Sequence, residues 1–400
     1  MRKLIWGLNI NIILLGLTSF LTDVSSEMMF PLMPMFITAL GGTGIAVGLI
    51  GGLSDSVASI LKVISGYWSD KVGKRKAFVF SGYLASAVSK IFFPLATNWY
   101  HILILNPIER VGKGLRVAPR DALVADWATP EVRGKAFGLH KSMDTLGATL
   151  GSFIALILFW SYNFSYKSIF VIAAFFAFLA LLPIFLVKEK EKKPEPITFM
   201  VSLKKLPSPL RWFILISALF ALGNFSYMFF ILKAQKSFIN IFSPKTATAL
   251  PILLYILFNL SHSLTALPFG VWSDKLGRKK IIFSGYFLFG LTCLGFVFAQ
   301  SILAFILLFL LYGISFSMIV GIQRAYVADL SPKELKGISL GTFHTAISIV
   351  TLPGSLFAGF FWEYLNPSST FLYGAIISFC SALLFFVFCQ VHKRKRIPLV

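Results

Sequence analysis

The stretch from Ile281 to Ile322 contains no charged residue, and this feature constrains the fold more than any other part of the chain. A membrane helix needs about 20 apolar residues, so the stretch is long enough for two spans. Helices are required because unpaired backbone groups cannot face lipid. Charged residues make up 13% of the chain, against about 25% in soluble domains. The 400 residues have room for twelve spans, so we expect an all-α membrane protein with twelve transmembrane helices.

The chain also repeats itself. The segment Gly66–Lys76 (GYWSDKVGKRK) returns as Gly270–Lys280 (GVWSDKLGRKK), with seven of eleven positions identical. Shorter matches extend the repeat: Ser81–Tyr83 with Ser284–Tyr286, and Ala125–Asp126 with Ala328–Asp329. Repeats of this length predict two pseudo-symmetric six-helix halves in the same orientation.

A single long polar connection separates the halves. It runs from Lys188 to Arg211 and contains the sequence KEKEKKPEPI, which is typical of a solvated linker. We therefore expect an N-terminal six-helix half over residues 1–187, a linker over 188–210, a C-terminal six-helix half over 211–391 and a basic tail over 392–400.

Lysine and arginine gather at alternate ends of the predicted spans. One side holds the basic groups of both repeats, the linker and the tail, whereas the other holds little beyond Lys167, Lys236 and Lys245. This asymmetry predicts a multi-pass protein of the plasma (inner) membrane with both termini cytoplasmic. The net charge of +21 then sets topology, and we expect no nucleic-acid partner. The expected partners are the lipid bilayer, a small-molecule solute and protons or another coupling cation, for a protein that works as a monomer.

The repeated loop carries a family resemblance. Its pattern, G-x-x-x-D-[RK]-x-G-[RK]-[RK], is present in both copies, and the chain resembles the major facilitator superfamily (MFS) over essentially its whole length. The resemblance implies two six-helix halves that rock around a central cavity. The stretch from Arg110 to Leu123 is similar to a prokaryotic branch whose members mostly lack an assigned substrate. Fold and mechanism therefore follow from the resemblance, but the solute does not.

The resemblance also implies a cytoplasmic latch, which holds the cytoplasmic side shut in the outward-open state. Its candidate residues are Gly66, Asp70, Lys71, Gly73 and Arg75 in the first copy and Gly270, Asp274, Lys275, Gly277 and Arg278 in the second. The glycines allow a tight turn and close helix approach, the aspartate can face the positive N-terminus of a helix in the other half, and the cations can pair with acidic groups there. The alternative is that these cations only set topology.

Ionisable residues inside the predicted spans lie mainly in the N-terminal half. Such residues are costly in a bilayer and face a cavity or a partner. Asp23 and Glu27 are four residues apart, so they share a helix face. Two nearby carboxylates in a low dielectric are expected to hold at least one proton near neutral pH, which indicates a proton-coupling or cation site. The alternative is a pair of structural salt bridges, for example to Lys62 or Lys141. The coupling candidates are Asp23, Glu27, Asp55 and Asp144.

The candidate substrate cavity combines cations of the N-terminal half with polar residues of the C-terminal half. Glu109, Lys113, Arg116 and Arg120 recur at spacings of four, three and four, and form a charged stripe that can bind an anionic group. The family resemblance implies that Arg110 contributes to coupling or substrate contact. The cavity candidates are Arg110, Lys113, Lys141, Lys62, Asn224, Asn259, His262 and His344. For each histidine, a hydrogen-bonded core position is the alternative.

One further pattern bears on the direction of transport. Gly138, Gly147, Gly151 and Ser152 partly match the glycine motif of exporters in the family, with Ser152 in place of the proline. Small-residue helix packing explains the same residues, so the match favours export only weakly.

We therefore expect a secondary active transporter that moves a small solute by rocker-switch alternating access, with proton-linked export as the main hypothesis. Proton-linked uptake of an organic anion is the close alternative, and a lipid flippase or a transporter-like sensor represents a different class. The sequence contains no nucleotide-binding glycine loop, metal cluster or nucleophile constellation, and its three cysteines lie in apolar runs. We expect no enzymatic activity, no cofactor and no metal.

Overall fold

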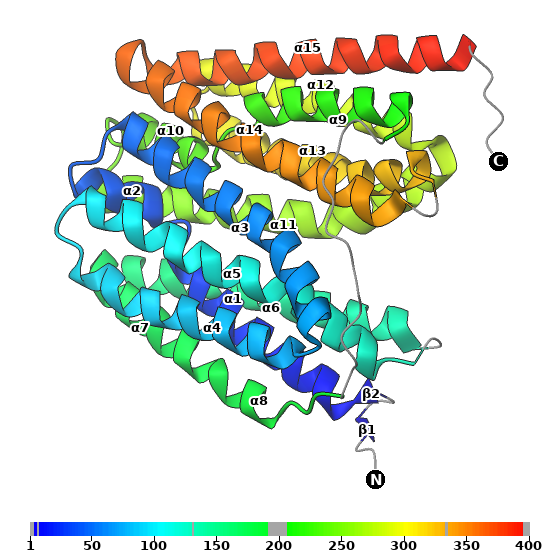
Figure 1. Ribbon diagram of the computed structural model, residues 1–400. Coiled ribbons are helices and arrows are strands. Elements are labelled where there is room, and N and C mark those ends of the chain that lie inside the picture. The colour runs from blue at the N-terminus through cyan, green and yellow to red at the C-terminus, as the bar shows by residue number, and fades with distance from the viewer. Residues whose placement is uncertain (1–3, 6–7, 130–131, 191–205, 333–334, 395–400) are drawn as a thin grey trace. The chain divides into compact units, whose positions relative to one another are not determined.

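The computed structural model describes residues 4–5, 8–129, 132–190, 206–332 and 335–394 (Figure 1). Within these residues, eleven helices are long and apolar enough to cross a membrane. A further helix, α5 (Trp99–Trp127), has 29 residues and is also long enough, but it carries the charged stripe. The prediction of an all-α membrane protein is confirmed. The short strands β1 (Leu4–Ile5) and β2 (Leu8–Asn9) pair near the N-terminus.

The described residues fall into two compact units, which we describe separately. Unit 1 takes its described residues from Met1–Gly42, Ser54–Phe199 and Phe242–Leu253, and unit 2 from Thr43–Leu53, Met200–Ile241 and Leu254–Val400. Two helix ends, residues 43–53 and 242–253, thus group with the unit opposite to the half in which they were predicted. Residues 191–205 of the predicted linker and 395–400 of the predicted tail lie outside the described residues.

Unit 1 is a helical bundle with an apolar core. Its helices are α1 (Ile10–Met29), α2 (Met33–Ala39), most of α3 (Gly44–Val72), α4 (Arg75–Phe92), α5, α6 (Arg133–Trp160), α7 (Tyr166–Leu179) and α8 (Leu181–Leu186), with a 3₁₀ turn at Phe93–Leu95. Helix α1 packs against α6, and α4 packs against α5 (Figure 1). The core contains fully buried residues from these helices, among them Ile12, Val79 and Leu123. The two helix pairs position the charged residues described below.

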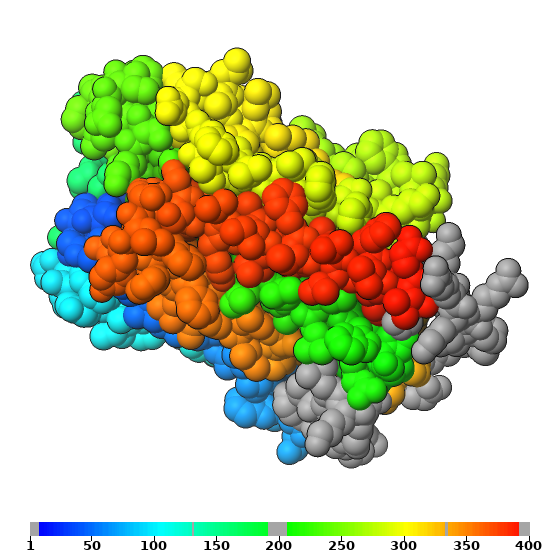
Figure 2. Space-filling view, turned by 90° about the horizontal axis from the view of Figure 1, so that it is seen from above, coloured from blue at the N-terminus to red at the C-terminus, as the bar shows by residue number. Residues whose placement is uncertain are grey.

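Unit 2 is a bundle whose core is rich in aromatic rings. Its helices are α9 (Ser208–Gly223), α10 (Met228–Phe238), most of α11 (Pro244–Leu276), α12 (Arg278–Phe298), α13 (Ile302–Leu330), α14 (Lys336–Tyr364) and α15 (Pro367–Arg394). Phe230 stacks on Tyr312 with 4.3 Å between ring centroids and meets Phe296 edge-on at 5.0 Å, which is the geometry that aromatic pairs prefer. Helix α15, red in Figure 2, lies on the surface of this unit against α9, α12 and α14.

The starts of α3 and α14 show why residues 43–53 group with unit 2. The amide of Gly44 donates a hydrogen bond to Oε2 of Glu363 at 2.8 Å. A Cβ on Gly44 would meet the Trp362 ring at 2.6 Å, and a Cβ on Gly52 would meet the backbone of Leu352 at 2.9 Å. Side chains larger than hydrogen would separate the helices, so the glycines of α3 permit direct backbone contact with α14.

Candidate functional site

Helix α5 carries its charged stripe into the interior of unit 1. The helix lies directly against α4, because a Cβ on Gly112 would meet the carbonyl oxygen of Gly82 at 2.5 Å. This close approach buries three charged side chains of the stripe region, Glu109, Arg110 and Arg116, of which at most 8% is exposed. Burial of charge is expensive unless ionic or hydrogen-bonding partners compensate for the lost hydration.

Glu109 is surrounded by cations. Nε of Arg110 lies 3.3 Å from Oε2 of Glu109, and the charges of Lys90, Arg116 and Lys113 also act on this carboxylate. Neither carboxylate oxygen has a hydrogen-bond partner among the described residues. Arg110 and Lys113, both predicted to face the cavity, are thus brought together around one buried carboxylate.

Lys90 on α4 is a buried cation that the candidates from sequence did not include. Only 1% of the residue is exposed, and its Nζ donates hydrogen bonds of 2.8 Å to the hydroxyl oxygens of Ser25 and Ser26 on α1. Ser25 in turn donates to the carbonyl oxygen of Ala173 on α7 at 2.6 Å. Lys90 therefore ties α4 to α1. In the sequence, a lone lysine within an apolar span is the feature that could have identified it.

The glycines of α6 serve helix packing in unit 1. A Cβ on Gly147 would collide with the backbone of Phe20, and a Cβ on Gly151 with the backbone of Val24. Helix α6 therefore lies in backbone contact with α1, which is the role that small residues have in membrane helix pairs. The pattern that partly resembled an exporter motif fixes how α6 is rotated against α1.

This packing turns Asp144 of α6 toward α1, the helix that carries Asp23. Asp144 is the charged group that acts most strongly on Asp23, followed by Lys113 and Arg120 of α5. Oδ1 of Asp144 lies 3.5 Å from Nδ1 of His140. Two of the four predicted coupling carboxylates thus share one site, on different helices and next to cations of α5.

The other two coupling candidates have different surroundings. Arg110 and Lys113 act on the charge of Asp55, so Asp55 belongs electrostatically to the stripe of α5. Glu27 lies one helical turn after Asp23 in α1, and its backbone carbonyl accepts a hydrogen bond from the hydroxyl of Ser152 at 3.3 Å. The helix face shared by Asp23 and Glu27 is present as predicted, but the strongest carboxylate neighbour of Asp23 comes from α6.

The predicted balancing cations, Lys62 and Lys141, differ from those that act most strongly on Asp23. His140, Asp144, Gly147 and Gly151 recur at spacings of four, three and four, so they share the face of α6 that meets α1. Lys141 lies off this face and is exposed, and Lys62 on α3 is half-buried. The rotation of α6 therefore directs Asp144 toward α1.

The cavity candidates of unit 2 lie among aromatic and apolar neighbours. The His262 ring is 5.3 Å from the Phe316 ring on α13. Nδ2 of Asn259 is buried and has no hydrogen-bond partner among the described residues. His344 is half-buried on α14, and Asn224 is the residue that ends α9. These residues provide polar groups in a largely apolar unit, whereas the charged chemistry belongs to unit 1.

The latch loop of unit 1 is organised by Arg75. Nη2 of Arg75 lies 2.5 Å from Oδ1 of Asp70, and Nη1 forms an ion pair with Asp126 at the end of α5. The loop turns at Gly73, whose φ of 73° suits glycine. We expected the cations to pair with acidic groups of the other half, whereas both of these partners of Arg75 lie in its own unit.

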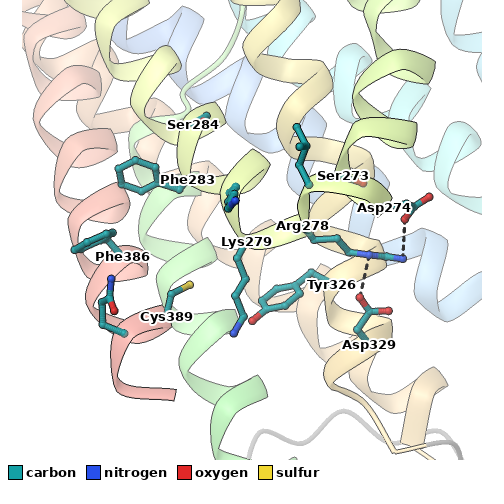
Figure 3. A pocket seen from close by; sticks show the side chains of 14 residues that line it. Ser273, Asp274, Arg278, Lys279, Phe283, Ser284, Tyr326, Asp329, Phe386 and Cys389 are labelled. Atoms are coloured by element: carbon teal, nitrogen blue, oxygen red, sulfur yellow. Dashed lines mark hydrogen bonds and ion pairs between the residues drawn. The ribbon is translucent and has the colours of Figure 1, made fainter. Parts of the chain in front are cut away.

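The latch loop of unit 2 repeats this arrangement, as Figure 3 shows. Nη2 of Arg278 lies 3.2 Å from Asp274, and its Nε lies 2.9 Å from Asp329 at the end of α13. Gly277 makes the turn with φ of 94°. Asp126 and Asp329 were not among the predicted latch residues, although the duplicated Ala-Asp pair was the signal that identifies them.

The remaining latch candidates lie at the edges of these loops. Gly66 packs against Ala118 of α5, which a Cβ would meet at 3.2 Å, and Nζ of Lys71 lies 5.8 Å from the centre of the Tyr67 ring. In unit 2, a Cβ on Gly270 would have no neighbour within 4 Å among the described residues, and Lys275 is exposed.

Comparison with known proteins gives a consistent result. A sequence model described as the Major Facilitator Superfamily matches residues 15–238 and 215–399. The chain is 46% identical over 378 residues to an uncharacterised MFS-type transporter of Methanocaldococcus jannaschii, with 94% of each chain covered. It is 29% identical over 194 residues to the multi-drug resistance efflux pump PmrA of Streptococcus pneumoniae, with 47% of each chain covered.

Solved structures share the fold at low sequence identity. A mutant of the nucleoside transporter NupG aligns with a TM-score of 0.81 at 14% identity, over 94% of this chain and 99% of that one. A mutant of the peptide transporter POT bound to sulfate aligns with a TM-score of 0.79 at 14% identity, over 98% and 96% of the two chains. The predicted architecture of two six-helix halves agrees with these likenesses.

Proposed function

The chain belongs to the Major Facilitator Superfamily, and we propose that this multi-pass membrane transporter exports a small solute by proton-linked alternating access. In this proposal the protein works as a monomer in the plasma membrane with both termini in the cytoplasm, and the latch loops stabilise one of its two conformations. The solute crosses through the family's central cavity, with Arg110 and Lys113 as the first candidates for contact.

The observation that carries the proposal is that Asp144 is the charged group acting most strongly on Asp23, near cations of α5. A second negative charge that acts on Asp23 inside a membrane protein makes a charged Asp23 costly unless nearby cations compensate for it. The compensation available here comes from Lys113 and Arg120 of α5. A shift of α5 relative to α1 and α6 would change this compensation, and thereby load or release the proton.

Export is supported by a relative and by the apolar surroundings of one candidate residue. The pneumococcal relative with 29% identity is named a multi-drug resistance efflux pump, over about half of each chain. A drug-like solute with apolar surface also suits the aromatic surroundings of His262 on unit 2.

Uptake of an organic anion is the second candidate, because of the charge around Glu109. Four cations, Arg110, Lys90, Arg116 and Lys113, act on this single carboxylate. Such an excess of buried positive charge can hold the carboxylate or phosphate of a solute.

The test is proton movement in proteoliposomes that contain the purified full-length protein and an enclosed pH-sensitive dye. Organic cations and organic anions are added in turn, with and without an imposed pH gradient. We expect organic cations to release protons through the wild-type protein, Asp144→Asn to abolish the signal and Ser142→Ala, an exposed change on the same helix, to retain it. A proton signal with organic anions alone would favour uptake, and unchanged coupling in Asp144→Asn would contradict the proposed site.

A further inference from the structure

Unit 2 contains a cavity of about 910 Å³ beside its latch loop. The cavity lies where the turn between α11 and α12 meets α13 and α15 (Figure 3). Lysine side chains line one part of the wall, and the aromatic rings of Phe283 and Phe386 line another. A cavity with both cationic and apolar walls suits an amphiphilic anion.

The positive charge in this cavity is not balanced by the neighbouring carboxylates. Asp274 and Asp329 both pair with Arg278. Lys279 has no hydrogen-bond or ion-pair partner among the described residues, and the charge of its ammonium acts on the thiol of Cys389. Figure 3 shows Lys279 extending between Tyr326 and Cys389. Lys280 adds a second cation to the wall.

The repeat in unit 1 shows which groups surround the matching lysine. The matching ion pairs place Arg278 and Asp329 each 203 positions after Arg75 and Asp126, so Lys279 corresponds to Lys76. The amide of Lys76 donates to Oε1 of Glu189 at 3.0 Å, and its Nζ donates to the carbonyl oxygen of Phe185 at 3.1 Å. In unit 1 the chain therefore supplies a carboxylate to the backbone amide at this position and a carbonyl oxygen to the ammonium.

Unit 2 has no corresponding acidic residue in its sequence. The position 203 residues after Glu189 is His392, which is followed by Lys393 and Arg394. The basic continuation of α15 cannot replace the carboxylate that Glu189 provides. The lysine is thus repeated between the units, whereas the carboxylate beside its backbone amide is not.

We propose that this cavity holds the phosphate of an anionic phospholipid, with Lys279 and Lys280 at the phosphate and an acyl chain along Phe283 and Phe386. Phe386 is 47% exposed on α15, and Phe287, one turn beyond Phe283, is 45% exposed on α12, so the apolar wall continues onto the lipid-facing surface. Basic pockets between transmembrane helices recognise anionic head groups in this way. Bound lipid would link α12 to α15, as Glu189 links the end of α8 to α4.

Cys389 provides a direct test because it lines the cavity. The full-length protein is placed in nanodiscs of phosphatidylcholine with or without phosphatidylglycerol, and the rate of modification by N-ethylmaleimide is followed at each cysteine by mass spectrometry. We expect phosphatidylglycerol to slow the modification of Cys389 severalfold and to leave Cys380, which is exposed elsewhere on α15, unchanged. Equal rates at Cys389 in both lipids would overturn the proposal.

Variants separate specific binding from a general effect of membrane charge. Each variant is compared with itself in the two lipid mixtures, because Lys279 also acts on the thiol. Lys279→Ala is expected to weaken the dependence on phosphatidylglycerol about fivefold, as loss of one lysine contact implies, whereas Lys275→Ala, outside the cavity wall, is expected to retain it. Retained protection in Lys279→Ala would show that surface charge alone slows the reaction.

A final set of measurements distinguishes a lipid phosphate from a soluble phosphate. Glycerol phosphate added to phosphatidylcholine nanodiscs is expected to give no protection, and Phe386→Ala is expected to reduce protection by phosphatidylglycerol. Protection by glycerol phosphate, or by a soluble glutamate-rich peptide, at the level of the lipid would contradict the assignment to a membrane lipid.

Discussion

Arg75, the first residue of α4, forms an ion pair with Asp126 near the end of α5. The same relationship recurs in unit 2, where Arg278 lies 2.9 Å from Asp329. In each unit the arginine also binds the aspartate of the loop motif. The motif's arginine therefore first organises its own unit, and any contact of the loop with the other half builds on this fixed arrangement.

The two ion pairs differ in burial, which predicts a difference in stability. The side chains of Arg75 and Asp126 are 14% and 13% exposed, whereas those of Arg278 and Asp329 are 25% and 51% exposed. Loss of one partner from a buried pair costs up to about 3–5 kcal/mol, and an exposed pair contributes about 0–1 kcal/mol. We expect Asp126→Asn to lower the thermal unfolding temperature in detergent clearly more than Asp329→Asn. Equal losses would show that burial does not decide the strength of these pairs.

The Asp23–Asp144 pair predicts which carboxylates couple transport to protons. We expect Asp23→Asn and Asp144→Asn each to abolish solute flux driven by a pH gradient, because the first removes the proposed proton carrier and the second removes the negative charge that acts most strongly on it. Glu27→Gln is expected to impair coupling less, since Asp144 acts most strongly on Asp23. Flux is measured in proteoliposomes with and without the gradient, and exchange without a gradient serves as the control for folding. If Glu27→Gln abolished coupling and Asp144→Asn did not, the proton site would consist of Asp23 and Glu27 rather than Asp23 and Asp144.

The packing of α6 on α1 predicts a sharp difference between two glycines of the same helix. A Cβ on Gly151 would overlap the backbone of Val24, whereas a Cβ on Gly138 would meet nothing within 4 Å among the described residues. Overpacking of a close contact costs about 1–3 kcal/mol. We therefore expect Gly151→Ala to reduce the yield of monodisperse protein and its unfolding temperature, with Gly138→Ala near wild type. A tolerated Gly151→Ala would mean that the helices can separate without loss.

The latch turn of unit 2 gives a matched test of backbone conformation. Gly277 has φ of 94° and ψ of 131°, a region at positive φ that residues with a Cβ rarely enter, at a cost of about 1–3 kcal/mol. Gly270 lies within α11, where alanine favours the helix and its Cβ would meet no neighbour within 4 Å in the part of the chain that the structure describes. We expect Gly277→Ala to lower the unfolding temperature and Gly270→Ala to leave it unchanged or raise it. A larger drop in unfolding temperature for Gly270→Ala than for Gly277→Ala would show that the conformation of Gly277 does not limit the stability of the loop.

Topology is tested at the linker predicted over residues 188–210. The excess of Lys and Arg on the side of the linker predicts a cytoplasmic position. We expect a protease that cuts after lysine to cleave the linker in inside-out vesicles and to spare it in right-side-out cells. Cleavage from outside intact cells would invert the proposed orientation.

Much of the architecture could be predicted from the sequence, because it depends on local properties. The uncharged stretch from Ile281 to Ile322 fixed its helices, since length and hydropathy are sufficient for a bilayer span. The repeat from Gly66 to Lys76 predicted two related halves, and the duplicated Asp70 and Asp274 marked both loops. The candidate charges inside the spans were also visible as residues that a bilayer disfavours.

The partners of these charges required the tertiary structure. Asp144, and not Lys62 of α3 or Lys141, is the charged residue named from the sequence that acts most strongly on Asp23, because Gly147 and Gly151 set the rotation of α6 against α1. That rotation follows from backbone contact between helices, which no spacing within one helix specifies.

The register of the repeat was likewise settled only in three dimensions. Asp70 and Asp274 are 204 positions apart. The ion-paired arginines, Arg75 and Arg278, are 203 positions apart, and so are the aspartates at the ends of α5 and α13 that bind them. The second copy therefore lacks one residue between Gly277 and Arg278. Alignment of the repeat by amino-acid identity matches Arg75 with Lys279. The ion pairs match it with Arg278 instead. The sequence by itself determined which elements exist and where charge is unavoidable; the tertiary structure decided which charges meet, because helix rotation and depth are properties of packing between elements distant in the chain.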